Sequence, residues 1–213
     1  MSAEPTTPMG HSSADPRAAG SRAAGSRAAG SRKQQILHEA ALLFARRGFH
    51  GVSIDELGAA VGISGPGLYR HFPGKEALLA QMLLGISDRL LAGATDLAAR
   101  IGNPAELLAA LVDFQLDFSL REPELITVQD RDLASLPSDD RRRVRALQRS
   151  YVEIWVDALR RLRPGLPVGS ARVAAHGVFG MLNSTPHSAF RADPDSAADQ
   201  LRRMAMAALT DAG

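Results

Sequence analysis

The chain of 213 residues contains no cysteine. This absence excludes a disulfide framework, thiolate metal sites, cysteine nucleophiles and thiol redox chemistry. The sequence also lacks any run of about 20 apolar residues without a charge, so neither a membrane span nor a secretion signal is predicted. Both absences fit a reducing setting inside the cell, and we expect a cytoplasmic protein without a membrane partner.

The sequence is also poor in strand signals. β-Branched residues are few, and no stretch alternates apolar with polar residues as a half-buried strand does. Apolar residues make up 45% of the chain and charged residues 23%, which is typical of soluble proteins with a real core. Because the apolar residues recur with a period near 3.6, we predict an all-α fold.

Positive charge is concentrated at the front of the chain. Residues 1–76 hold nine Lys or Arg against six Asp or Glu, whereas residues 77–213 hold sixteen against seventeen. The segment 17–32, RAAGSRAAGSRAAGSR, repeats one pentapeptide with an arginine at every fifth position. Residues 1–30 have no large apolar residue after Met9, and each repeat carries a glycine that costs about 1 kcal/mol in a helix. We therefore predict a disordered basic arm over 1–30, which either binds DNA phosphates or the minor groove, or is a spacer.

Helical patterns divide the rest of the chain into two domains, at 31–76 and 77–213. In the first domain a helix begins near Ser31 and ends at Gly48, and two short helices are capped by Ser53 and Ser64, the second extending to about Phe72. A fourth helix begins near Pro73 and extends to about Ala92. Further helices are predicted at about 104–120, 123–133, 138–163, 170–183 and 195–210.

The two short helices have the layout of a helix-turn-helix unit. Ser53 and Glu56 have the spacing of a capping box, and Gly62 permits a sharp turn before Ser64 begins the next helix. In such units the later helix enters the major groove of DNA. A plain helical corner within a bundle is the alternative interpretation of the same layout.

The segment 51–79, GVSIDELGAAVGISGPGLYRHFPGKEALL, resembles the DNA-binding region of TetR-type transcriptional regulators. The signature comprises Leu68, Tyr69, Arg70, His71, Phe72, Lys75, Glu76 and Leu78. This resemblance implies that the chain binds a double-stranded DNA operator. The predicted DNA-binding residues are Ser53, Ser64, Gly65, Pro66, Gly67, Tyr69, Arg70, His71 and Lys75.

Residue type suggests a role for several of these positions. Tyr69 suits a phosphate contact, as the resemblance implies, and Lys75 at the start of a helix can bind phosphate together with free backbone N–H groups. Arg70 and His71 can reach base edges or phosphates. Family members often carry longer polar side chains where this chain has Gly65, Pro66 and Gly67. We therefore expect backbone approach, thymine-methyl contacts and DNA shape to contribute to recognition.

The C-terminal helices predict self-association. The helix at 170–183 is apolar nearly all round, and the resemblance implies that it pairs with the helix at 195–210 and with their copies in a homodimer. Two recognition helices about 34–36 Å apart would then read a palindromic site. Burial of these helices within a monomer is the alternative.

A pocket for an unidentified small-molecule inducer is expected inside the bundle of residues 104–186, as the resemblance implies. Its candidate residues are aromatic or sparsely polar. They are Phe114, Phe118, Gln129, Asp130, Tyr151, Trp155, His176, Phe179 and Asn183. The arginines at 141, 142, 143, 145 and 149 could attract an anionic ligand such as an acyl-coenzyme A. A solvated helix face, with Asp139 paired to Arg143, is the alternative.

Together with these patterns, the resemblance implies a homodimeric repressor that a hydrophobic or acyl-coenzyme-A-like inducer releases from its operator. A helical adaptor without sequence-specific DNA binding is the alternative. An enzyme would need Asp113, Asp117, Asp130 and His176 to converge, and the sequence shows no phosphate loop, nucleophile elbow or paired histidine motif. We expect no enzymatic activity, no cofactor and no metal.

Overall fold

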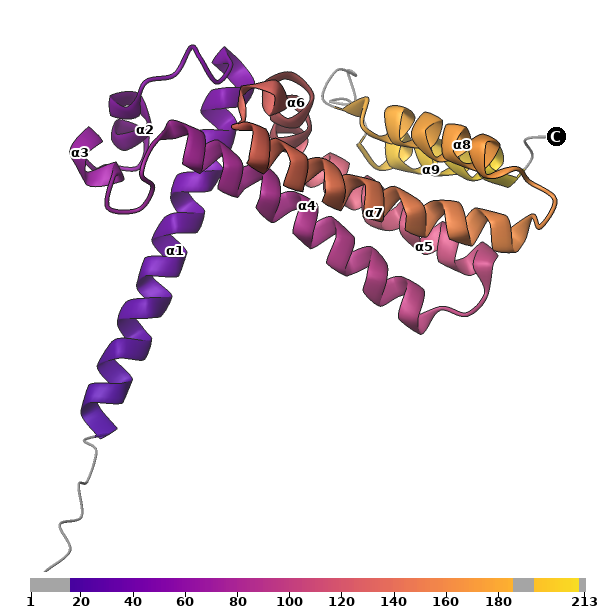
Figure 1. The fold of residues 1–213 in the computed structure, drawn as a ribbon, viewed down its shortest axis with the longest axis horizontal. Coiled ribbons are helices and arrows are strands. Elements are labelled where there is room, and N and C mark those ends of the chain that lie inside the picture. The colour runs from indigo at the N-terminus through magenta and orange to yellow at the C-terminus, as the bar shows by residue number, and fades with distance from the viewer. Residues whose placement is uncertain (1–15, 186–193, 211–213) are drawn as a thin grey trace, which may run out of the picture.

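The computed structural model describes residues 16–185 and 194–210, and within these ranges the chain consists of helices and turns without a strand (Figure 1). The predicted all-α fold is confirmed. The elements in chain order are α1 (Pro16–Arg47), α2 (Ile54–Ala60), α3 (Gly65–Leu68), α4 (Lys75–Arg100), α5 (Pro104–Arg121), α6 (Pro123–Asp132), η1 (Leu133–Ser135), α7 (Ser138–Leu162), α8 (Val168–Leu182) and α9 (Pro194–Thr210).

Two apolar cores lie along the molecule, and α4 contributes to both. The first core joins α1, α2, α3 and the start of α4 around Phe44, Leu68 and Phe72. The second core joins the far end of α4 to α5, α7, α8 and α9 around Trp155. By length and composition α4 is the one helix in the described ranges that could cross a membrane, but 44% of its most apolar window is buried. It is packed as the core helix of a globular bundle.

The first helix is longer than the sequence pattern predicts. It begins at Pro16 instead of Ser31, and Figure 1 shows its N-terminal part projecting away from the rest of the molecule. The predicted arm over 1–30 stays a prediction: residues 16–30 are drawn as part of α1, and residues 1–15 lie outside the described part. Each pentapeptide contributes two alanines and an arginine, which are good helix formers, and no proline follows Pro16 to interrupt them. The helix ends where expected, at Gly48 with a φ of 79°.

The helix-turn-helix unit depends on two glycines. Gly62 adopts a φ of 69° in the turn between α2 and α3, a conformation that glycine accepts without steric cost. Gly58 is buried in α2, where a Cβ atom would lie 2.7 Å from the carbonyl oxygen of Ile63. The close approach of α2 to the turn therefore requires glycine at position 58.

Two helix ends differ from the prediction. α3 ends at Leu68 and continues as a turn to Phe72, in which the N–H of His71 donates to the carbonyl of Leu68 at 2.9 Å. The N–H groups of Arg70 and His71 bond to carbonyls three residues back, at Gly67 and Leu68, so the chain tightens into a turn there, and Pro73 prevents the helix from resuming through Phe72. α4 extends to Arg100 instead of Ala92, because neither glycine nor proline interrupts it beyond Gly93 until Gly102.

Candidate DNA-binding surface and ligand pocket

A reciprocal capping box fixes the start of α2. The Ser53 hydroxyl accepts from the N–H of Glu56 at 3.2 Å, and the Glu56 carboxylate accepts from the N–H of Ser53 at 2.8 Å. Glu56 also forms an ion pair with Arg47 at the end of α1. The hydrogen bonds from Ser53, together with Arg47, hold the pKa of Glu56 below its usual value. α2 is thus fixed to α1 by the predicted capping residues.

The Gly-Pro-Gly opening of α3 has a packing role. Ser64 caps α3 by accepting from the N–H of Gly67 at 3.2 Å. Gly65 is buried against α2, and a Cβ atom there would lie 2.0 Å from a carboxylate oxygen of Asp55. Pro66 is exposed beside it. The missing side chain at position 65 therefore lets α3 approach α2, a reason that the sequence pattern alone did not reveal.

The turn after α3 presents its polar side chains outward. Tyr69 is 55% exposed, Arg70 is exposed and His71 is half-buried. The side chains of Tyr69 and Arg70 form no hydrogen bond or ion pair with the part of the chain that the structure describes. Leu68 and Phe72 are buried on the opposite side, as the sequence predicts. A buried apolar pair thus holds a free aromatic hydroxyl and a free guanidinium at the surface.

Lys75 is engaged inside the domain. Its ammonium donates to the carbonyl oxygens of Phe49 and Val52, each at 2.8 Å, and lies 4.5 Å from the centre of the Phe49 ring. The sequence pattern assigns this ammonium to a DNA phosphate. In the structure the Lys75 ammonium also has a structural role, because its hydrogen bonds connect the loop between α1 and α2 to the start of α4.

Two basic residues next to the arginine repeat also contact the helix-turn-helix unit. Arg32 donates to the carbonyl oxygen of Val61 at 2.7 Å, and the Lys33 ammonium lies 5.8 Å from the centre of the Phe72 ring. Arg32 is the last arginine of the repeat, and Lys33 follows it directly. Their contacts instead place them in the folded domain, where they support α2 and the turn after α3.

A cavity of about 190 Å³ lies between α4, α5, α6, α7 and α8. Six predicted residues line it: Phe118, Gln129, Tyr151, His176, Phe179 and Asn183. Five lining residues were not predicted: Ser87, Leu90, Gln115, Gln148 and Val152. Ser87 and Leu90 belong to α4, which lies outside the bundle of residues 104–186 in which the pocket is predicted.

Three predicted pocket residues do not line the cavity. Trp155 is fully buried behind Phe179, with ring centres 4.7 Å apart. Phe114 fills the space above Gly93, where a Cβ atom would lie 2.3 Å from its ring. Asp130 is exposed on α6. The two aromatic residues are therefore packed in the core, and Asp130 is not among the residues that line the cavity.

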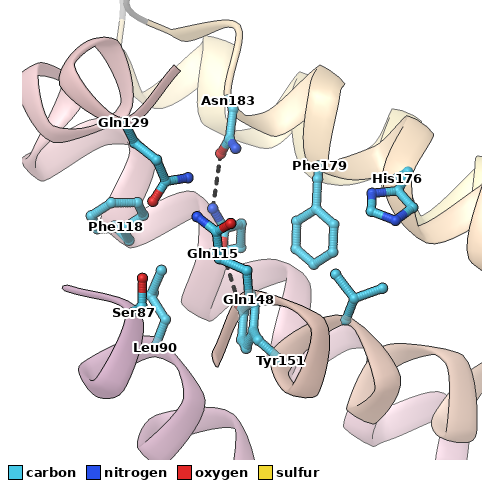
Figure 2. A pocket seen from close by; sticks show the side chains of 11 residues that line it. Ser87, Leu90, Gln115, Phe118, Gln129, Gln148, Tyr151, His176, Phe179 and Asn183 are labelled. Carbon is cyan, nitrogen blue, oxygen red and sulfur yellow. Dashed lines mark hydrogen bonds between the residues drawn. The ribbon is translucent and has the colours of Figure 1, made fainter. Parts of the chain in front are cut away.

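A chain of hydrogen bonds joins three residues that line the cavity, as Figure 2 shows. The Tyr151 hydroxyl donates to the side-chain oxygen of Gln115 at 2.8 Å, and the Gln115 amide nitrogen donates to the side-chain oxygen of Asn183 at 2.8 Å. Burial raises the pKa of Tyr151, so the phenol keeps its hydrogen. Three helices, α5, α7 and the end of α8, are thereby connected through buried polar groups.

A basic groove of about 440 Å³ adjoins the cavity and shares Gln148, Val152 and His176 with it. Arg145, Arg149 and Arg172 line the groove. Arg172 forms two hydrogen bonds with Glu153, whereas Arg145 and Arg149 form no ion pair with any described residue.

The other arginines of the cluster at the start of α7 lie outside this groove. Arg142 pairs with Asp139 at 2.5 Å and Arg143 with Asp140 at 3.4 Å, so the predicted pair of Asp139 with Arg143 is wrong. Both observed pairs are three residues apart, which also places the partners on one helix face. Arg141 donates to the carbonyl oxygen of Ala134. The cluster is therefore divided between a solvated face and the groove.

Two family models match the chain. Residues 36–82 match the bacterial regulatory proteins of the tetR family, and residues 102–209 match the tetracyclin repressor-like C-terminal domain. The second match alone covers just over half of the chain.

The chain belongs to the TetR family of transcriptional regulators.

Individual TetR relatives share both sequence and fold with the chain. The transcriptional repressor KstR2 of Mycobacterium tuberculosis is 32% identical over 134 residues, which cover 59% of this chain and 63% of the relative. A TetR-family regulator from Bordetella parapertussis has a TM-score of 0.74 at 29% identity, over 81% of this chain and 93% of the other. AibR, solved in complex with isovaleryl coenzyme A and operator DNA, has a TM-score of 0.69 at 24% identity, over 83% and 96% of the two chains.

Membership of the TetR family also confirms that the chain is not an enzyme, since these relatives are transcriptional regulators. The acidic residues considered for catalysis have other partners. Asp113 pairs with Arg202 and Asp117 with Arg121. In the described ranges no three His, Cys, Asp or Glu side chains come together as metal ligands would.

Among the described residues, no other element covers an apolar strip on α8 and α9. Val173 is 73% exposed and Met204 is 44% exposed. Gly177 and Gly180 are exposed on α8, and a Cβ atom at either position would meet nothing within 4 Å. Ala171, Ala175, Val178 and Leu182 are buried on the other side of α8. This helix is therefore covered on one side only.

Proposed function

We propose that the chain is a homodimeric repressor that binds a palindromic operator and releases it when a small molecule occupies the bundle. The observation that carries this proposal is the exposed pair Tyr69 and Arg70, which has no partner in the described chain and stands on a capped helix-turn-helix unit. A phenol hydroxyl and a guanidinium in this position suit phosphate oxygens and base edges in the major groove. The cytoplasm is the compartment in which we place this activity.

The other proposed DNA contacts surround this pair. Ser53, Ser64 and Pro66 are exposed beside it, and His71 is half-buried. We assign Gly67 to close approach of the backbone to DNA, whereas the buried Gly65 contributes indirectly by letting α3 pack on α2. The N-terminal end of α4 at Lys75 offers free backbone N–H groups to a phosphate, even though the ammonium itself contacts the loop.

The uncovered strip on α8 and α9 supports homodimerisation. The exposed Val173 and Met204 offer apolar surface that a partner can cover, and the glycines on α8 allow another helix to approach closely. A second copy of the same strip covers both surfaces in a two-fold arrangement. Two DNA-binding units are then available to two half-sites of a palindrome.

The ligand that we propose is an organic anion with an apolar part, such as an acyl-coenzyme A. The cavity supplies Leu90, Phe118 and Phe179 for the apolar part, and the adjoining groove supplies arginines for the anion. AibR, which shares the fold, was solved with isovaleryl coenzyme A and operator DNA. The relative KstR2 is named as a transcriptional repressor, which supports repression as the mode of action proposed here.

Selection of bound fragments from the source genome tests this function. We expect wild-type protein to enrich a small set of fragments that share a palindrome. The matched control is a Tyr69→Ala, Arg70→Ala variant, which removes the two exposed side chains without touching either core. If wild type enriches no fragment above this control, the chain is a helical adaptor without sequence-specific DNA binding.

A further inference from the structure

We infer that Asn183 reads a carbonyl oxygen of the ligand, and that the ligand is a short acyl group carried on a phosphate-bearing anion. This inference rests on the proposed ligand-controlled function and specifies the chemistry of its ligand. It depends on three features of the site: the fixed direction of a hydrogen-bond chain, the size of the cavity and the free charges beside it.

The direction of the hydrogen-bond chain begins at Tyr151. A buried phenol has one hydrogen to donate, and its acceptor is the side-chain oxygen of Gln115 at 2.8 Å. The other end of the Gln115 amide is then a donor, so Asn183 has to offer its oxygen, at 2.8 Å. The Ser119 hydroxyl lies 3.4 Å from the same oxygen of Asn183.

The amide nitrogen of Asn183 is consequently left as a donor. It forms no hydrogen bond with any residue in the described ranges, and Asn183 lines the cavity (Figure 2). Gln129 and Gln148 also line the cavity, but no partner fixes which end of their amides faces it. The orientation of the Asn183 amide is therefore fixed before the ligand binds, with its NH₂ group left to donate. A carbonyl oxygen of the ligand can accept this hydrogen bond.

The cavity limits the size of the group that enters. At about 30 Å³ for each water-sized group, a cavity of about 190 Å³ holds roughly six such groups. A butyryl or similar short acyl group fits this space, whereas a chain of ten carbons exceeds it. The apolar wall formed by Leu90, Phe118 and Phe179 suits the hydrocarbon part of the group.

The adjoining groove supplies the charge. Arg145 and Arg149 are exposed, lie four residues apart on α7 and have no anionic partner among the described residues. Guanidinium groups in this spacing suit the several phosphates of a coenzyme A better than one carboxylate. Because Gln148, Val152 and His176 line both spaces, one molecule can occupy the cavity and the groove together.

Binding of matched coenzyme A compounds tests the role of Asn183. Butyryl-coenzyme A carries the thioester carbonyl, and S-butyl-coenzyme A is the thioether that lacks it. Calorimetry should show roughly 3- to 10-fold tighter binding of the thioester to wild type, as one net hydrogen bond implies. Asn183→Asp keeps the acceptor for Gln115 and replaces the free donor by an acceptor, so this variant should lose the preference. Asn183→Leu provides a second test of the same loss.

A longer acyl chain tests the size limit of the cavity, and two pairs of arginine variants test the charge of the groove. Decanoyl-coenzyme A should bind more weakly than butyryl-coenzyme A. An Arg145→Gln, Arg149→Gln variant should bind both butyl compounds at least tenfold more weakly, while Arg142→Gln, Arg143→Gln, with the same change of charge on the same helix, should bind them as wild type does.

Several outcomes would overturn the inference. Equal binding of thioester and thioether to wild type would contradict the contact between Asn183 and the ligand carbonyl, but not the size limit or the groove. A preference for the thioester that survives in both Asn183 variants would do the same. Tighter binding of decanoyl-coenzyme A contradicts the size limit, and equal losses in the two arginine variants contradict the groove. If no coenzyme A compound binds a wild-type protein that still binds its operator, the ligand part of the proposed function fails as well.

Discussion

Arg131 on α6 donates a hydrogen bond to the carbonyl oxygen of Ala45 at 3.2 Å, close to the end of α1. The same guanidinium contacts the carbonyl oxygen of Phe44 and pairs with Asp132 at 3.0 Å, whose side chain is only 6% exposed. Two residues earlier on the same helix, Gln129 lines the cavity. α6 therefore connects the pocket wall with the end of the first helix of the DNA-binding unit.

Replacement of Arg131 by alanine should destabilise the protein. It leaves the Asp132 carboxylate without its cation and the last carbonyls of α1 without a donor, which together should lower the free energy of unfolding by about 1–2 kcal/mol. This loss is below the range of about 3–5 kcal/mol for broken buried pairs, since the Arg131 side chain is 42% exposed. Urea unfolding measures the change, and adding Asp132→Asn should restore part of the stability. An unchanged urea midpoint would contradict the role of this contact.

Lys75→Ala should weaken DNA binding through the structure of the domain. Loss of two hydrogen bonds to the loop at Phe49 and Val52 should lower both thermal stability and operator affinity. The slope of log affinity against log salt should stay that of wild type. A slope reduced by about 0.9 would instead assign a DNA phosphate to the Lys75 ammonium. Tyr69→Phe is the contrasting variant, which should lower affinity without lowering stability because the Tyr69 side chain is exposed.

Val173→Glu should prevent self-association. A carboxylate at this exposed position on α8 would face its own copy across the proposed two-fold axis, where burial of unpaired charge is unfavourable. Light scattering should give the mass of one chain for the variant and of two for wild type, and operator affinity should fall at least 100-fold. Ser150→Glu, exposed on α7, is the control for charge and should remain dimeric. A dimeric Val173→Glu protein would place the interface elsewhere.

Deletion of residues 1–30 should weaken binding to all DNA alike. The deleted segment includes Arg17, Arg22 and Arg27, whereas Arg32 and Lys33 remain because they contact the helix-turn-helix unit. The salt dependence of binding should become shallower, as fewer counterions are released. Replacing the three arginines by glutamine should reproduce the effect if charge is responsible. Unchanged affinity and salt slope in the deletion variant would show that the repeat is a spacer.

Much of the helical layout could be predicted because local signals determine it. Gly48 and Gly62 adopt the positive φ values that glycine permits, and Ser53 and Ser64 cap their helices as their spacing predicts. The start of α1 was not predictable in this way. Glycines argue against a helix over the repeat, while its alanines, together with the absence of a later proline, favour one.

The sites were harder to predict because they depend on tertiary contacts. Nothing in the sequence shows that the Lys75 ammonium turns toward Phe49, or that Gly65 packs on Asp55. Aromatic residue type cannot separate Phe179 in the pocket wall from Trp155 behind it. Gln115 could be found only as one polar residue on an otherwise apolar helix face, and its two partners lie on other helices.

The most direct measurement is the specificity ratio of the purified protein for an enriched genomic fragment. Fluorescence anisotropy at about 0.15 M salt compares the affinity for this fragment with that for a shuffled fragment of equal length and composition. A sequence-specific regulator should prefer the enriched fragment by about 10³-fold or more. A ratio near one would contradict the account, since the exposed Tyr69 and Arg70 would then bind DNA without reading its sequence.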